Sequence, residues 1–78
     1  MITTTILQVL FNCDGNAVNE TVLLAETRIQ AKRCGENEFQ TALVRLRQNG
    51  FATSQEDPLT GDTLWVITKK GINRVEGK

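Results

Sequence analysis

The stretch FQTALVRLRQNGFATSQ, residues 39–55, decides the fold. Up to Gly50 its apolar residues recur at the i, i+3, i+4, i+7 spacing of one helix face. These residues are Phe39, Ala42, Leu43 and Leu46. The helix ends at Gly50, because glycine readily takes the left-handed conformation that follows a helix cap. Beyond it apolar and polar residues alternate with a period of two, so a helix over 38–49 is expected to run directly into a strand over 51–56.

A second strand is expected over 63–68, where Trp65 and Ile67 share one face and form the inner pair. Between the two strands lies EDPLTGD, residues 56–62, whose proline and glycine are typical of a turn. The two strands therefore form a β-hairpin with a loop of medium length. The short segment that follows residue 68 is expected to fold back on the core.

Two further helices are expected upstream, over 2–12 and over 20–33. In the first, an apolar stripe at helical spacing is widened by Leu7 and Phe11. The core of that stripe comprises Ile2, Ile6, Val9 and Leu10. In the second helix, the inner stripe is assigned to Val22, Ala25 and Ile29, helped by Leu24 or Leu23.

The ends of these helices carry capping signals. Asn19 is expected to be the N-cap of the second helix, because an amide oxygen can accept from a free backbone N–H there. Gly35 is its expected left-handed stop. Asn37 and Gln40 have the spacing of a capping box at the start of the third helix.

Composition limits the functions that this chain can have. Its 78 residues suffice for one small domain, and 40% of them are hydrophobic. There is no histidine, so the commonest general base and most zinc sites are excluded. The two cysteines, Cys13 and Cys34, are expected to be reduced thiols. No catalytic residue, metal site or cofactor is predicted, so an enzyme is not expected. No membrane span or signal peptide is expected either, which favours a cytoplasmic protein.

The net charge of zero hides a block pattern along the chain. Nine basic and nine acidic residues cancel overall. Acidic residues exceed basic ones by three over 1–27 and again over 50–63, whereas basic residues exceed acidic ones by three over 28–49 and over 64–78. If the fold brings the two basic blocks together, they form one cationic face; otherwise the charges cancel as four solvated segments.

Two short motifs carry a family resemblance. The segment LRQNGF, residues 46–51, resembles the passage from recognition helix into wing in winged helix-turn-helix domains. The segment WVITKKG, residues 65–71, resembles the aromatic-x-apolar-Thr-x-x-Gly ending of that wing, as found in regulators of the multiple-antibiotic-resistance and phenolic-acid-decarboxylase-regulator kinds. The resemblance implies a mainly α fold with a small β-hairpin, three helices then a two-stranded wing, in a single domain over 1–78.

The resemblance also implies a small DNA-binding protein, a transcriptional regulator or accessory DNA-binding factor, with helix 38–49 in the major groove of duplex DNA. At 100° per residue, the face opposite the apolar stripe and its flanks carry the candidate base-contacting residues. These are Asn37, Gln40, Thr41, Val44, Arg45, Arg47 and Gln48. Arg28, Lys69 and Lys70 are the candidate phosphate anchors.

An alternative from another class stays open. The same fold can serve as a protein-interaction module without DNA binding, and the acidic loop with Leu59 and the exposed Val44 suit that use. The sequence ends at Lys78, before the long dimerisation helices of the families it resembles, so a monomer or a weak homodimer is expected. The open apolar face of helix 2–12, around Leu7 and Phe11, is the expected dimer contact.

Overall fold

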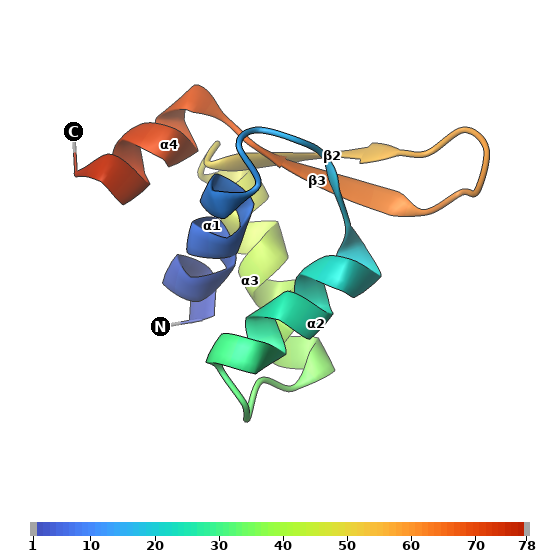
Figure 1. The fold of residues 1–78 in the computed structure, drawn as a ribbon, viewed down its shortest axis with the longest axis horizontal. Coiled ribbons are helices and arrows are strands. Elements are labelled where there is room, and N and C mark those ends of the chain that lie inside the picture. The colour runs from blue at the N-terminus through green and yellow to red at the C-terminus, as the bar shows by residue number, and fades with distance from the viewer. Residues whose placement is uncertain (1, 78) are drawn as a thin grey trace.

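A computed structural model describes residues 2–77 of the chain. Four helices and three strands follow one another in the described part, as Figure 1 shows. In chain order they are α1 (Ile2–Asn12), β1 (Val18–Asn19), α2 (Glu20–Gln30), α3 (Glu36–Gln48), β2 (Ala52–Glu56), β3 (Thr63–Ile67) and α4 (Lys69–Glu76). The expected helices α1, α2 and α3 and the expected hairpin are therefore present, α1 with the expected bounds and the others with ends shifted by at most three residues.

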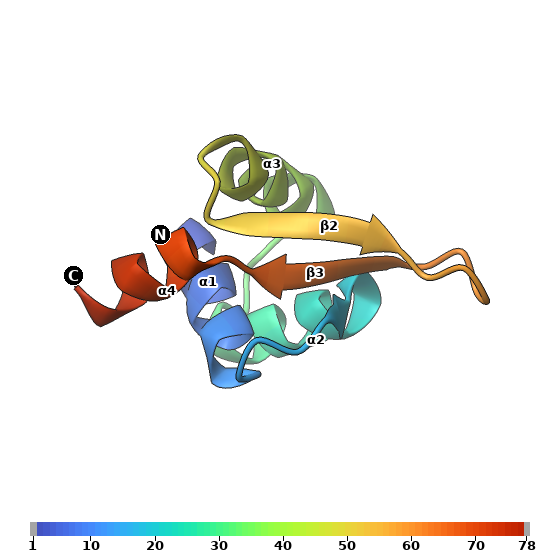
Figure 2. The same ribbon diagram turned by 90° about the horizontal axis from the view of Figure 1, so that it is seen from above.

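The three strands form an antiparallel sheet in the order β1-β3-β2. Trp65 at the centre of β3 lies between Ser54 of β2 and Val18 of β1. The hairpin of β2 and β3 extends well beyond the helices, while α4 lies at the opposite end of the molecule (Figures 1 and 2). The sheet therefore joins a helical body to a projecting hairpin tip.

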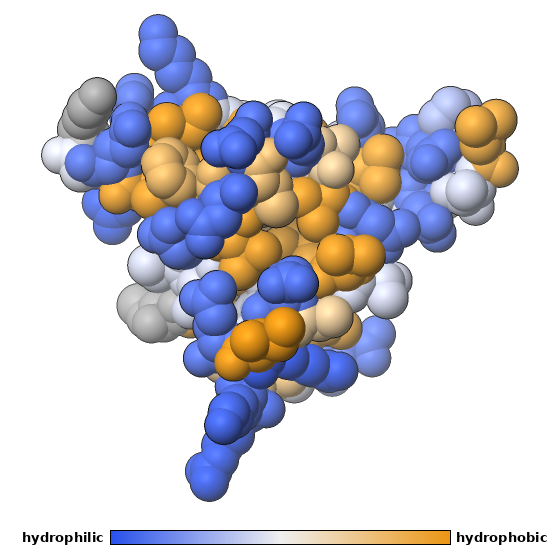
Figure 3. All heavy atoms as spheres, in the orientation of Figure 1, coloured by the Kyte–Doolittle hydropathy of each residue, from blue (hydrophilic) through white to orange (hydrophobic). Residues whose placement is uncertain are grey.

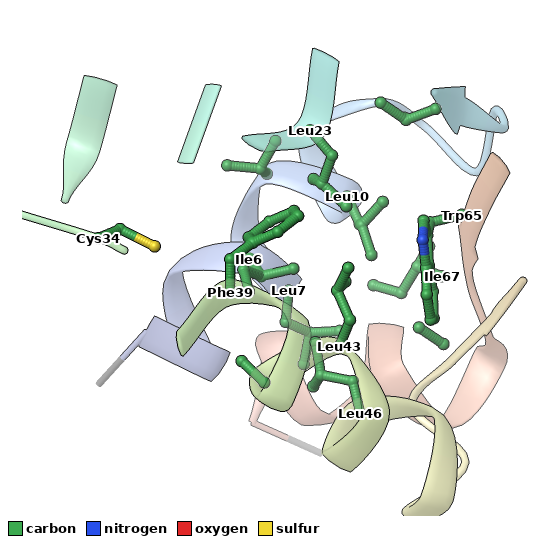
Figure 4. Close-up of a cluster of buried hydrophobic side chains, with 14 residues drawn as sticks. Ile6, Leu7, Leu10, Leu23, Cys34, Phe39, Leu43, Leu46, Trp65 and Ile67 are labelled. Atoms are coloured by element: carbon green, nitrogen blue, oxygen red, sulfur yellow. The ribbon is translucent and has the colours of Figure 1, made fainter. Parts of the chain in front are cut away.

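The core forms where α1, α3 and the inner face of the sheet meet, and Figure 4 shows its side chains. Phe39 and Leu43 of α3 pack with Ile6 and Leu10 of α1, and all four are fully buried. Leu46, Trp65 and Ile67 are buried as well, so the prediction of the inner faces of α3 and β3 is confirmed. Leu7 is buried too, which overturns the expectation of an open apolar face on α1.

Helix α2 presents the opposite face from the one expected. Val22 and Ile29 of the expected inner stripe are 52% and 68% exposed, and Ala25 is exposed as well. Leu23, one of the two leucines expected to help the stripe, is fully buried, and the other buried residue of α2 is Thr27. Thr27 is tolerated in the core because its hydroxyl donates to the carbonyl oxygen of Leu23 at 2.7 Å, which satisfies the buried polar group.

The ends of α2 and α3 differ in part from the expected caps. Asn19 is the N-cap of α2, as predicted, and its Oδ1 accepts from the backbone N–H of Thr21 at 2.8 Å. Helix α2 ends at Gln30, so Gly35 does not stop it and has a negative φ of −80°. Gly35 is the N-cap of α3 without any side-chain cap hydrogen bond, so the predicted capping box of Asn37 is wrong.

Two elements were not expected. Strand β1 has two residues and exists through its pairing with β3, which makes the sheet three-stranded rather than two-stranded. The final segment is a helix, α4, with Thr68 as its N-cap. Thr68 connects the turn after α3 with α4. Its Oγ1 donates to the carbonyl of Gly50 at 2.6 Å and accepts from the N–H of Gly71 at 3.1 Å. This bond network ties α4 to the turn that follows α3.

Candidate nucleic-acid interface

The outward face of α3 carries all seven residues that the sequence assigned to base contacts. Each of them is exposed, and Val44 is 39% exposed. The helix can hold them outward because the opposite side of α3 is anchored by Phe39, Leu43 and Leu46 in the core. The face therefore combines two amides, Asn37 and Gln48, with hydroxyl, apolar and guanidinium groups on one helix. Neither amide makes a hydrogen bond within residues 2–77.

Gln40 belongs to a bonded cluster at one flank of this face. Its Nε2 donates to Oε2 of Glu20 at 3.1 Å, and Oε1 of the same carboxylate accepts from the indole N–H of Trp65 at 2.9 Å. Hydrogen bonds to an ionised acceptor are stronger than neutral ones. Glu20 thus connects α2, α3 and β3, and one of the two N–H donors of the Gln40 amide is used within the protein.

Arg47 leans toward the sheet rather than straight outward. Its Nη1 donates to Oγ of Ser54 on β2 at 3.3 Å, and its guanidinium carbon lies 6.0 Å from the centre of the Trp65 ring. These contacts hold the side chain in the corner between α3 and the hairpin. Arg45, on the other flank of α3, makes no hydrogen bond within residues 2–77.

The candidate phosphate anchors lie at the two ends of α3. Nε of Arg28 donates to the carbonyl oxygen of Cys34 at 3.2 Å, immediately before α3 begins. Nζ of Lys70 donates to the carbonyl oxygen of Asn49 at 2.8 Å, immediately after α3 ends, and lies 5.2 Å from the Phe51 ring centre. Lys69 is exposed beside it. One cation from each basic block therefore lies at each end of α3. The sequence alone left open whether the fold brings the two blocks together.

Acidic side chains border this cationic surface at two places. Glu36 and Glu38 lie in the first turn of α3, where carboxylates complement the helix dipole. Glu56, Asp57 and Asp62 lie at the far end of the hairpin, well away from α3 (Figure 2). The positive groups thus gather at the body of the molecule, and the hairpin tip is acidic.

A cavity of about 500 Å³ opens between α1, α3 and α4. Leu7, Leu46 and Val75 contribute apolar side chains to its lining, whereas Arg45 and Arg74 bring guanidinium groups from two different helices. Arg74 belongs to the basic block that follows the wing, but it is not among the residues that the sequence assigned to the interface. Its position in this cavity depends on α4 folding back against α1.

The remaining reactive groups offer little chemistry. Residues 2–77 contain no group of three His, Cys, Asp or Glu side chains placed to hold a metal ion. Cys13 and Cys34 are free thiols. Burial raises the pKa of the Cys34 thiol, and the nearby Glu38 carboxylate raises it further, against the opposing effect of Arg28.

Within the described part of the chain, no helix has the length and apolar character needed to cross a membrane.

The fold has a close counterpart among solved structures. A transcriptional regulator from Clostridium thermocellum superposes with a TM-score of 0.80 and is 24% identical, and the match covers 97% of this chain and 74% of the regulator. The chain therefore shares its mainly helical fold with that regulator. No protein-family model and no curated protein matches the sequence.

Proposed function

We propose that the chain is a winged helix-turn-helix transcriptional regulator that binds duplex DNA with α3 in the major groove. In this arrangement the β2–β3 hairpin is the wing. The observation that carries the proposal is the outward face of α3, which is exposed along its length and has cations at both ends. Similarity to the fold of a transcriptional regulator supports it.

The outward side chains have the chemistry for reading base edges. Amides such as Asn37 and Gln48 pair bidentately with adenine, and a free guanidinium such as Arg45 pairs with guanine. Thr41 and Val44 offer methyl groups for the methyl of thymine. Gln40 and Arg47 already bond within the protein, so they hold the helix in place and add less to the discrimination between bases.

The anchors are held in place before DNA arrives. Arg28 uses one N–H on the protein and keeps four of its five donors, and Lys70 keeps two of its three. Phosphate contacts from the two ends of α3 would set its register along the groove without reading sequence. Lys69 adds a further charge beside Lys70, and Glu36 and Glu38 limit the affinity by repelling phosphate.

The test is a titration of the protein with mixed-sequence duplex DNA, followed by fluorescence anisotropy as the salt concentration is varied. Five cations engage: Arg28, Arg45, Arg47, Lys69 and Lys70. A log–log slope of about −4 to −5 is therefore expected, with a nonspecific Kd around 10⁻⁴ to 10⁻⁶ M at physiological salt.

Two variants of Lys70 separate charge from structure. Lys70→Gln removes the charge but keeps a donor for the carbonyl of Asn49, so it should flatten the slope by about one and weaken all sequences alike. Lys70→Arg should retain the slope. Gln48→Ala should instead change the sequence preference, because it removes a base contact.

A flat anisotropy signal at about 50 mM salt would contradict DNA binding, because electrostatic affinity is large under those conditions. The second candidate, a protein-interaction module, would then take its place. One observation favours it specifically: Leu59 is 93% exposed at a hairpin tip that carries three carboxylates and no cation, and carboxylates repel phosphate.

A further inference from the structure

The hairpin tip, residues 56–62, combines one exposed apolar side chain with three carboxylates. We call the tip the knob and its three carboxylates the collar. Leu59 is 93% exposed at its apex. Glu56, Asp57 and Asp62 belong to the same seven residues and bring three negative charges without a basic residue. Figure 3 shows apolar atoms at the end of the hairpin, set among hydrophilic ones.

The knob keeps its shape without a partner. Oδ1 of Asp57 accepts from the N–H of Leu59 at 2.9 Å, and the N–H of Gly61 donates to the carbonyl of Asp57 at 2.8 Å. At the base of the tip, Nδ2 of Asn19 donates to Oδ2 of Asp62 at 3.0 Å. A turn ordered in this way loses little conformational entropy on binding.

The cavity between α1, α3 and α4 has the complementary chemistry. Its lining is mixed, with apolar groups beside threonine, amide and guanidinium groups, and its volume of about 500 Å³ can receive a leucine side chain. Arg45 and Arg74 supply two positive charges, and neither guanidinium has a hydrogen-bond partner among residues 2–77. The cavity, which we call the hole, thus combines apolar groups with two cations.

We propose that the hairpin tip of one copy docks into this cavity of a second copy. Leu59 enters the hole against its apolar groups, and the carboxylates of the collar lie against Arg45 and Arg74. The tip projects at one end of a molecule whose longest extent is 36 Å, whereas α4, which helps to line the cavity, lies at the other end (Figures 1 and 2). The tip therefore does not reach the cavity of its own chain.

This contact is head-to-tail, because it joins two different surfaces. Such an interface leaves one free knob and one free hole on every assembly, so copies add into an open chain unless a ring closes. A small tip buries less than the roughly 800 Å² per partner of a standard interface, so the association is weak and depends on concentration. The inference goes beyond the proposed function, since it needs no DNA.

Sedimentation velocity of the DNA-free protein tests the proposal. The weight-average mass should rise with protein concentration up to about 1 mM, the weak end of the affinity scale. The rise should be stronger at about 0.01 M salt than at about 1 M salt, because the charged rim is screened at high salt. Leu59→Asp and Arg74→Glu should each keep the protein monomeric, since one disables the knob and the other the hole.

Matched controls carry the same charge changes elsewhere. Val22→Asp alters an exposed apolar residue of α2, and Lys32→Glu reverses an exposed cation near the end of that helix. Both lie outside the knob and the hole and should assemble as the wild type does. Arg45 is not used as a test position, because it also belongs to the proposed DNA surface.

Mixing the two disabled variants gives the decisive result. Leu59→Asp retains a working hole and Arg74→Glu retains a working knob, so the mixture should form a 1:1 dimer and nothing larger. A wild type that stays monomeric at low salt, a Leu59→Asp protein that assembles normally, or a mixture that stays monomeric would each overturn the proposal. None of these outcomes depends on whether the protein binds DNA.

Discussion

Replacing Gly71 by alanine tests how α4 is joined to the body of the molecule. Gly71 lies in the first turn of α4, and helix propensity alone predicts that alanine stabilises such a position by about 1 kcal/mol. The structure predicts the opposite. A Cβ at this position meets the carbonyl oxygen of Phe51 and lies 2.7 Å from Cγ1 of Ile67. Helix α4 would have to move away from the turn after α3.

The loss of stability expected for Gly71→Ala follows from the contacts that this movement of α4 breaks. Forcing an extra carbon into a packed site costs about 1–3 kcal/mol. The same carbonyl oxygen of Phe51 accepts from the N–H of Thr68 at 3.0 Å, and losing this bond costs about 1 kcal/mol more. After subtracting the propensity gain, Gly71→Ala should destabilise the protein by about 2 kcal/mol, which corresponds to about 8–16 °C in Tm for a domain of this size.

Urea unfolding followed by circular dichroism measures the change, with Gly35→Ala as the control. Gly35 has an ordinary extended conformation and open space where a Cβ would lie, so its replacement should cost no more than about 1 kcal/mol, the usual range for an N-cap. A Gly71→Ala protein as stable as the wild type, or more stable, would refute the close approach of α4 to Phe51.

Two further predictions concern the core. Leu43→Ala should cost about 2–5 kcal/mol in the same urea assay, because the side chain is fully buried, and a loss below about 0.5 kcal/mol would contradict the orientation of α3. Since burial raises the pKa of Cys34 in the folded protein, the unfolded chain loses the thiol proton at a lower pH than the folded one. This contribution to stability should be complete below about pH 8.5 and decline at higher pH, and Cys34→Ala should decline less steeply.

Local patterns in the sequence determined much of the helical framework. The helix at 38–49 and the hairpin after it were predicted from a change of period at Gly50, which has a φ of +77° as a helix stop requires. Asn19 was recognised as a cap from its residue type alone. The outward face of α3 was also predictable, since a single narrow apolar stripe leaves one orientation for the helix.

Tertiary contacts decided the features that lack such a pattern. Helix α2 carries apolar residues on two faces, and packing against α1 and β1 selected Leu23 over Val22. Strand β1 is too short for any periodicity and forms by pairing with β3. Only the folded chain brings Arg28 and Lys70 to opposite ends of α3, and Arg74 to the cavity beside Arg45. Residue order encodes the faces of a helix, whereas contacts between distant segments depend on how those faces pack.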